Sequence, residues 1–305
     1  MHDNNPLGSH GLGLWVVAAL LWAGGGQIPC PAAELSGATS MAGAAPGAQG
    51  LVQHAQELAE RGAVYSAQAE FVQVLKLVAQ SLDAQQGATP HGDALTAGLQ
   101  AMLEADDFAP ADARRGNGMD LSRLIAMHRT PLLKQADASQ LTPLRALQAY
   151  YSFAQKQLAL AGGHETAASM ALYGWARLQT VIGERSNIPK AVALHQAAVA
   201  VDPRNFPAAN ELAVLMARCG ALEEARQLLL HSLSMCERSE TWHNLAVVYE
   251  GQGQNEQALR ARNRCQELLA AERARQQADS TAGGKIYWVN NEAFAQHSNL
   301  GSVQR

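Results

Sequence analysis

Charged and aromatic residues are scarce in this chain of 305 residues, at 16% and 5% of the total. The net charge is only −4, and no lysine or arginine precedes Arg61. A protein that wraps nucleic acid needs a basic stripe that displaces counterions, and this sequence has none. Runs of β-branched and aromatic residues at period two are also lacking before residue 285. Their absence makes Rossmann, TIM-barrel and β-sandwich folds poor fits.

The short motifs of catalysis and metal binding are missing as well. The sequence has no G-x-x-x-x-G-K-[ST] phosphate loop, no H-E-x-x-H zinc motif and no G-x-S-x-G nucleophile elbow. Local candidates such as His164-Glu165 and Asp106-Asp107 are more simply helix ends. We therefore predict that the protein is not an enzyme and binds no metal and no cofactor. The weakest alternative is an enzyme whose site lies in the N-terminal half, near His128 and His164.

The four cysteines lack the C-x-x-C spacing of zinc and redox sites. Besides Cys30 they are Cys219, Cys236 and Cys265. Because cysteine is often buried as a small apolar residue, free thiols are the simpler prediction for these three. One disulfide among them is the alternative if the chain is exported.

An apolar run, residues 11–23, is too short to span a bilayer comfortably but has the length of a signal-peptide core. The ten residues before it carry no lysine or arginine, which is unusual for a signal peptide. We predict that residues 1–30 are a signal peptide or an apolar leader, and that the protein is exported to the periplasm or cell envelope. There are two alternatives. One is a cytoplasmic protein with a disordered leader or a misassigned start, and the other is a retained membrane anchor. Residues 31–50, rich in Ala, Gly, Ser and Pro, are predicted to be a disordered linker.

Alanine, the strongest helix former, occurs 58 times, in long stretches with Leu, Gln and Glu that predict an all-α protein. Within residues 172–272 a pattern of large and small residues recurs. Aligned on the small residue that opens each second helix, Ala191, Ala225 and Ala258 are 34 and 33 residues apart. Pro203 ends one helix, and Gly220 and Gly253 mark turns. The large residues of the pattern are Trp175, Leu178, Leu212, Trp242, Leu245 and Tyr249.

This pattern resembles the tetratricopeptide repeat (TPR) family, in which W-x2-L-G-x2-Y, A-x3-F and a proline recur over 34 residues. The resemblance implies pairs of antiparallel helices that stack into a solenoid. Residues 51–84, with Gly62, Ala67 and Phe71, are predicted to be a divergent repeat. The predicted fold is an all-α, TPR-like helix-turn-helix repeat solenoid. It has irregular N-terminal helices over residues 51–171, repeats and a capping helix over 172–278, and a short non-helical C-terminal tail.

The resemblance also implies a concave surface built by the first helix of each repeat. Its projecting residues would be Ala176, Thr180, Asn210, Val214, Arg218, His243, Val247 and Glu250. The lysine–asparagine clamp with which some family members hold C-terminal carboxylates is absent at these positions. We expect a non-catalytic scaffold or adaptor whose groove binds a peptide or a helix of a protein partner, with no nucleic acid and no membrane span. The alternative is a structural subunit, capped by its own tail, that forms homo-oligomers.

The C-terminal tail, residues 279–305, holds three of the sixteen aromatic residues, more than a free tail would. We predict that it docks on the last helix or in the groove, through Ile286, Tyr287, Trp288 and Phe294.

Overall fold

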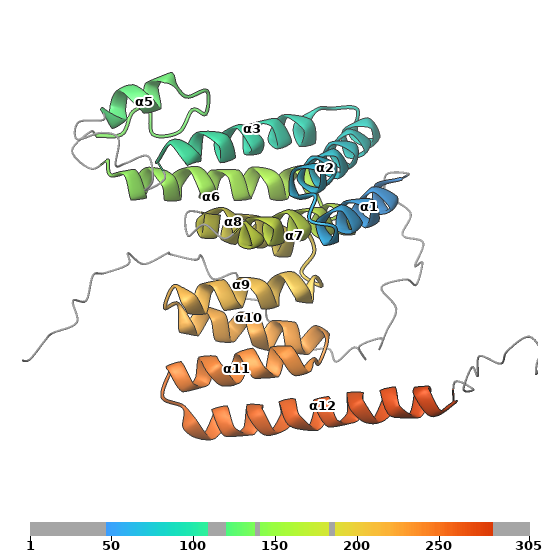
Figure 1. Ribbon diagram of the computed structural model, residues 1–305. Helices are drawn as coiled ribbons and strands as arrows, with labels where there is room; N and C mark the ends of the chain where they lie inside the picture. Colours follow the sequence, from blue (N-terminus) through green and yellow to red (C-terminus); the bar gives the residue numbers. More distant parts are fainter. Residues whose placement is uncertain (1–46, 109–119, 138–140, 183–186, 283–305) are drawn as a thin grey trace, which may run out of the picture.

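All regular structure in the described residues is helical (Figure 1). The computed structural model describes residues 47–108, 120–137, 141–182 and 187–282. The α-helices are α1 (Ala48–Glu60), α2 (Val64–Gln86), α3 (Pro90–Ala105), α5 (Leu121–Met127), α6 (Pro143–Gly162), α7 (Thr166–Val181), α8 (Ile188–Val201), α9 (Phe206–Arg218), α10 (Leu222–Met235), α11 (Ser239–Gly251) and α12 (Asn255–Ala282). A 3-10 turn, η1 (Asp106–Phe108), follows α3. The predicted all-α class is confirmed.

Four helical hairpins, α1–α2, α7–α8, α9–α10 and α11–α12, stack into one array. The second helix of each hairpin packs on the first helix of the next, α2 on α7, α8 on α9 and α10 on α11. The array therefore has the architecture of a TPR-like helical repeat. Figure 1 shows the stack running down to α12, which extends well beyond α11.

Residues 90–162 form an insertion between the first and second hairpins of this array. Its two long helices, α3 and α6, pack against each other, with α3 on α2 and α6 on α8. The insertion thus covers second helices of two hairpins. The N-terminal half looks irregular in sequence because one hairpin of the array precedes this insertion and the next follows it.

The turns within three hairpins are built alike around a glycine. Gly62, Gly220 and Gly253 have φ values of 78°, 83° and 73°, a region that favours glycine because it has no Cβ. In each turn the glycine N–H donates to a carbonyl three residues back, at 2.9–3.0 Å. The helix before each turn has 13 residues. Residues 48–86 therefore have the local geometry of the later hairpins.

Several sequence-predicted boundaries move in the structure. The linker predicted to end at residue 50 ends earlier, since α1 begins at Ala48. The repeats predicted from residue 172 begin with α7, six residues earlier at Thr166. The capping helix predicted to end at 278 continues to Ala282. The leader over 1–30 and the tail residues 283–305 lie outside the described residues. No helix in the described part of the chain combines the length and the apolar character that crossing a membrane requires.

The cysteines only partly follow the sequence prediction. Cys219 and Cys265 are free, the first half-buried and the second buried. Cys236 is disulfide-bonded, so the prediction of a free thiol is wrong there, and neither of the other two is its partner. Burial raises the pKa of the Cys219 thiol, which keeps it protonated and weakly reactive at neutral pH.

The first hairpin meets the second through Phe71 of α2 and Gly174 of α7. A Cβ atom built on Gly174 would lie 2.2 Å from Cζ of the Phe71 ring, closer than any real contact. Phe71 itself is buried, at 1% exposure. The absence of a side chain at residue 174 therefore lets the ring lie against the α7 backbone.

Replacing Gly174 by alanine should destabilise the protein by about 1–3 kcal/mol, because the ring and the new methyl group cannot occupy the same space. Chemical denaturation measures the loss, and adding Phe71→Leu should recover part of it. Gly50→Ala is the matched control, because a Cβ there meets nothing within 4 Å. Equal stability of Gly174→Ala and wild type would contradict the packing of α2 on α7.

The core of the second hairpin contains a histidine, His195 of α8, at the place of the large aromatic residue in the repeat pattern. It is 1% exposed, and its Nδ1 atom has no hydrogen-bond partner among the residues that the structure describes. Burial, with a smaller contribution from the Arg177 charge, lowers the pKa of His195 to about 3. The ring is therefore neutral in the folded protein at all but strongly acidic pH.

This buried histidine predicts a defined loss of stability in acid. The unfolded chain protonates His195 near its usual pKa of 6.5 and the folded chain only near 3, so the unfolded state binds more protons between these values. Stability should fall below pH 6.5 by up to about 1.4 kcal/mol per pH unit from this group. His195→Leu should remove that slope in denaturation curves measured between pH 7 and pH 4. His164→Leu, at an exposed histidine, should keep it, and the same slope in both variants would contradict the assignment.

Candidate protein-binding surface

More residues separate the two helices of the second hairpin than those of its neighbours, and this shifts the alignment of its first helix. Six residues, 182–187, separate α7 from α8, whereas three residues, 219–221 and 252–254, form the turns of the next two hairpins. The three extra residues move α7 by three positions relative to the sequence alignment. The first position of each unit is then Ser169, Phe206 and Ser239.

Burial and hydrogen bonding support this structural alignment. The eighth position becomes Ala176, Ala213 and Ala246, each at most 1% exposed. Ser169 Oγ donates to the Ala198 carbonyl at 2.7 Å, and Ser232 Oγ donates to the Phe206 carbonyl at 3.0 Å. Ala198 and Ser232 are equivalent residues of the two second helices. Both bonds therefore join the first residue of a unit to the same point on its second helix.

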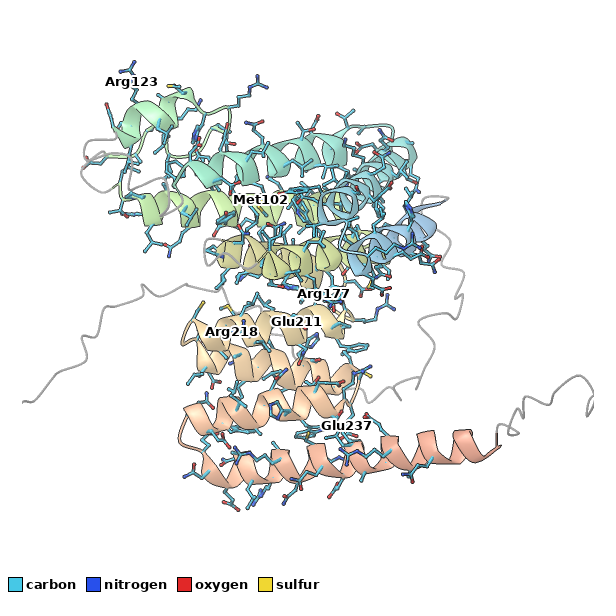
Figure 2. All side chains as sticks on the ribbon, viewed as in Figure 1. Met102, Arg123, Arg177, Glu211, Arg218 and Glu237 are labelled. Carbon is cyan, nitrogen blue, oxygen red and sulfur yellow. The ribbon has the colours of Figure 1, made fainter. Side chains whose placement is uncertain are left out.

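Ala176 does not project into a groove, contrary to the sequence prediction. It is completely buried and belongs to the close contact between helices. The fifth and ninth positions, which the family resemblance assigns to the concave surface, are occupied in α7 by Tyr173 and Arg177. Tyr173 is half-buried and Arg177 is exposed, whereas Thr180 is exposed nearer the end of the helix. Figure 2 labels Arg177 on this helix.

The other predicted groove residues lie on the side of α9 and α11 that the neighbouring hairpins leave uncovered. We call the uncovered side of α7, α9 and α11 the first-helix surface. Arg218, His243 and Val247 are exposed, and Asn210, Val214 and Glu250 are half-buried. These side chains therefore do not form the core.

Two polar residues of this surface that the sequence analysis missed are Asn244 and Tyr173. Asn244 Nδ2 donates to Asn210 Oδ1 at 3.1 Å and so links α11 to α9. The Arg177 guanidinium lies over the Tyr173 ring, 5.9 Å from its centroid. Burial raises the pKa of Tyr173, so its hydroxyl stays protonated. The signal that could have found Tyr173 is the early start of its helix. Because α7 begins at Thr166, before Ser169 at the first position of the unit, Tyr173 takes the fifth position.

The predicted structural residues of the repeats are mostly in the core. Trp175, Leu178, Ala191, Leu212, Ala225, Leu245 and Ala258 are buried, Pro203, Trp242 and Tyr249 are half-buried, and Gly220 and Gly253 are exposed in turns. Trp242 differs from a pure packing residue, since its Nε1–H donates to Glu237 Oε1 at 3.0 Å. Trp175 Nε1 is buried, with no hydrogen-bond partner in the described part of the chain.

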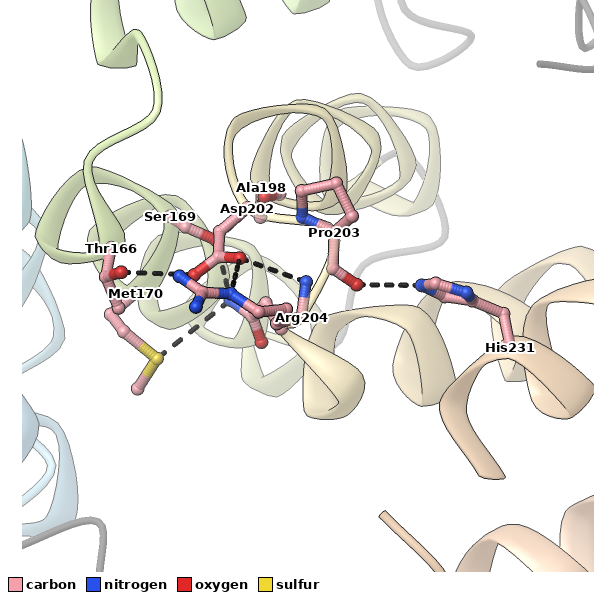
Figure 3. A network of polar contacts seen from close by, with 9 residues as sticks. Thr166, Ser169, Met170, Ala198, Asp202, Pro203, Arg204 and His231 are labelled. Carbon is pink, nitrogen blue, oxygen red and sulfur yellow. Dashed lines mark hydrogen bonds and ion pairs between the residues drawn. The ribbon is translucent and has the colours of Figure 1, made fainter. Parts of the chain in front are cut away.

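A polar network fixes successive hairpins relative to one another (Figure 3). Asn205 Nδ2 donates to Ser169 Oγ at 2.8 Å, and Asn205 Oδ1 caps α9 by accepting from the Ala208 N–H at 3.1 Å. His231 Nε2 of α10 donates to the Pro203 carbonyl at 2.7 Å. Because these bonds join α7, α9 and α10, they hold the first-helix surface in one shape.

The acidic residues after α3 meet His128 and two tyrosines in a second polar cluster. His128 is buried between the Tyr150 hydroxyl, 2.8 Å from Nδ1, and Asp107 Oδ2, 3.1 Å from Nε2. Burial, with the charges of Glu104 and Asp107, raises the pKa of Tyr150 to about 12. The phenol is therefore a protonated hydrogen-bonding group at neutral pH and a poor acid–base catalyst.

Neighbouring bonds show that the cluster holds the chain together. Glu104 accepts from the backbone N–H of Arg129 and of Thr130, at 2.6 and 3.2 Å. Lys190 Nζ of α8 donates to Asp106 Oδ2 at 2.8 Å. The cluster ties the segment after α5 to α3 and the insertion to α8.

The structure does not bring the two histidines of the enzyme hypothesis together. His128 contacts Tyr150 near the start of α6, and His164 follows the end of that helix. At 1.5 Å per residue, the stretch from Tyr150 to Gly162 alone spans about 18 Å. The described residues also contain no group of three or more His, Cys, Asp or Glu side chains arranged to hold a metal ion.

Comparison with known proteins yields only distant likenesses. No protein-family model matches the sequence, and no curated protein matches it. Two solved structures, titled "Crystal structure of MamA" and "Crystal structure of MamA protein", are similar at TM-scores of 0.33 and 0.32. The first is 19% identical over 54% of this chain and 97% of its own, and the second is 13% identical over 80% and 98%. Likenesses this distant carry no information about a partner or an activity.

Proposed function

We propose that this protein is a non-catalytic scaffold that binds a segment of a partner protein along the first-helix surface. The observation that carries the proposal is the contrast between the two sides of the array. On one side the inserted helices α3 and α6 cover α2 and α8. On the other, exposed side chains project from α7, α9 and α11, among them Arg177, Arg218 and His243.

The composition of this surface suits protein recognition. Tyr173 and Val247 offer apolar area, and Val247 is 50% exposed. Asn210 and Asn244 offer amide groups that can bond to a peptide backbone. An extended peptide or an amphipathic helix is recognised by such a combination of shallow apolar contacts and fixed hydrogen-bonding groups.

A charge introduced on the first-helix surface should abolish partner binding without unfolding the protein. Val247→Glu places a carboxylate on the first-helix surface, and Leu230→Glu on α10 is the matched control, since Leu230 is 37% exposed on a second helix. Cross-linking and mass spectrometry in native cells should identify proteins that bind wild type and Leu230→Glu but not Val247→Glu. Melting curves check that both variants fold. An identical set of cross-linked proteins for all three forms would contradict the proposal.

The same experiment separates the scaffold from a structural subunit that forms homo-oligomers. If the only cross-links that Val247→Glu loses join two copies of this chain, the surface serves self-assembly. Light scattering of the purified wild type and Val247→Glu then shows the change in mass directly.

We also propose that the apolar run at residues 11–23 directs export and that the leader is removed. Sequencing the N-terminus of protein purified from its native cells should give a mature start after Gly25 or after Ala32, where small residues allow cleavage. Recovery of soluble protein that keeps Met1 would show that the chain is not processed in this way.

A further inference from the structure

Most cations of the three stacked hairpins are neutralised by a carboxylate. The side chains that the structure describes between Thr166 and Gln277 include ten lysines and arginines. Seven of these form ion pairs: Lys190 with Asp106, Arg204 with Asp202, Arg226 with Glu223, Arg238 with Glu240, Arg260 with Glu256, Arg262 with Glu250, and Arg264 with Glu237 and Glu267. An arginine without such a partner is therefore the exception in this part of the molecule.

Three arginines form no ion pair within the described residues: Arg273 near the end of α12, and Arg177 and Arg218, which both lie on the first-helix surface. Positions are counted from Ser169 in α7 and from Phe206 in α9. Arg177 is then at the ninth position of its unit, and Arg218 is at the thirteenth position of the next unit. Both are exposed, and neither forms an ion pair within the described residues. Figure 2 labels both, together with Arg123, which lies far away at α5.

Structural roles account for these arginines only in part. Arg218 is in the last turn of α9, where a cation interacts favourably with the helix dipole, but Arg177 is inside α7 and gains no such benefit. The Arg177 guanidinium lies over the Tyr173 ring, 5.9 Å from its centroid, and also hydrogen-bonds to the Tyr173 side chain. A guanidinium has five N–H donors, so this contact positions Arg177 at the surface without using all of them.

We propose that Arg177 and Arg218 receive carboxylates of the partner, so that the bound segment is acidic. This inference rests on the proposed function, because it names the chemistry of the segment that the scaffold would hold. Arginine suits the role because its planar fork binds a carboxylate through two parallel hydrogen bonds. Val214 and Val247, on the same surface, would contact apolar side chains of that segment.

The acidic residues of the surface limit where the carboxylates can bind. Glu250 is already paired with Arg262, so it does not add a free negative charge. Glu211 lies close enough to Tyr173 to raise its pKa, and it would repel a carboxylate placed beside it. Charge complementarity is therefore local to the two guanidinium groups, and a uniformly basic surface is not implied.

Two synthetic peptides test the inference directly. One alternates glutamate with leucine, and the other alternates glutamine with leucine. Fluorescence anisotropy of the labelled peptides with the full-length chain should show binding of the glutamate peptide, weakened by added salt because exposed charges are screened. The double variant Arg177→Gln/Arg218→Gln should bind it at least about tenfold more weakly, the loss of about 1.4 kcal/mol that two exposed charge-assisted contacts supply.

Arg123→Gln is the matched control, because it removes an exposed arginine of the same kind away from the first-helix surface. It should leave the affinity unchanged. An equal loss for Arg123→Gln and the double variant would overturn the inference, since the attraction would then be general. Equal binding of both peptides would also overturn it. If Val247→Glu abolished that charge-independent binding, the proposed function would stand while the acidic preference failed.

The other candidate to occupy the first-helix surface is the chain's own C-terminal tail, which the sequence analysis predicts to dock on the last helix or in the groove. The titration is therefore repeated with a chain shortened to end at Ala282. Binding that appears only after shortening and still needs both arginines supports the inference and identifies the tail as a competitor. Failure of both forms to bind the glutamate peptide overturns it.

Discussion

Close packing of two helices through alanine is the contact on which the array depends. Each hairpin buries alanines from both of its helices: Ala55 and Ala67, Ala176 and Ala191, Ala213 and Ala225, Ala246 and Ala258. Because the distance between helix axes depends on the side chains at the contact, alanine allows a short one. Larger neighbours such as Leu212 and Leu245 then join one apolar cluster that runs through α8, α9, α10 and α11. A single hairpin would leave them exposed, so the hairpins are stable only as a stack.

The insertion changes what this stack can present to a partner. It shares a core with the first two hairpins, and α8 contributes to that core and to the cluster beyond it. Since α6, α7 and α9 all pack on α8, eight of the fourteen residues of this helix are buried, including His195. The second-helix side of the upper array is thus occupied by the chain itself. The first helices carry the side chains that are left for another molecule.

Much of this fold could be predicted from spacing, and the errors have identifiable physical causes. Second helices were placed correctly because Ala191, Ala225 and Ala258 recur at near-constant intervals. The first helix of the second hairpin was placed three residues too late. The six residues between α7 and α8 leave the spacing from Trp175 to Ala191 equal to that from Trp242 to Ala258, so the two tryptophans align in sequence. Trp175 and Leu178 are both apolar and both buried, so composition could not reveal the shift. The role of α3 and α6 as an insertion depends on contacts between α2 and α7, which are distant in sequence and leave no periodic signal.

The corrected alignment matters for function because it changes the character of the surface. Under the sequence alignment, the second hairpin contributes Ala176 and Thr180, which are small and uncharged. In the structure the corresponding residues are Tyr173 and Arg177, an aromatic ring with a cation over it. Positions inside a hairpin are restricted by packing to alanine and a few apolar residues, whereas the fifth and ninth positions of α7, α9 and α11 hold Tyr and Arg, Asn and Val, and His and Val. Packing does not dictate these residues, so their chemistry is where the sequence can record what the protein binds.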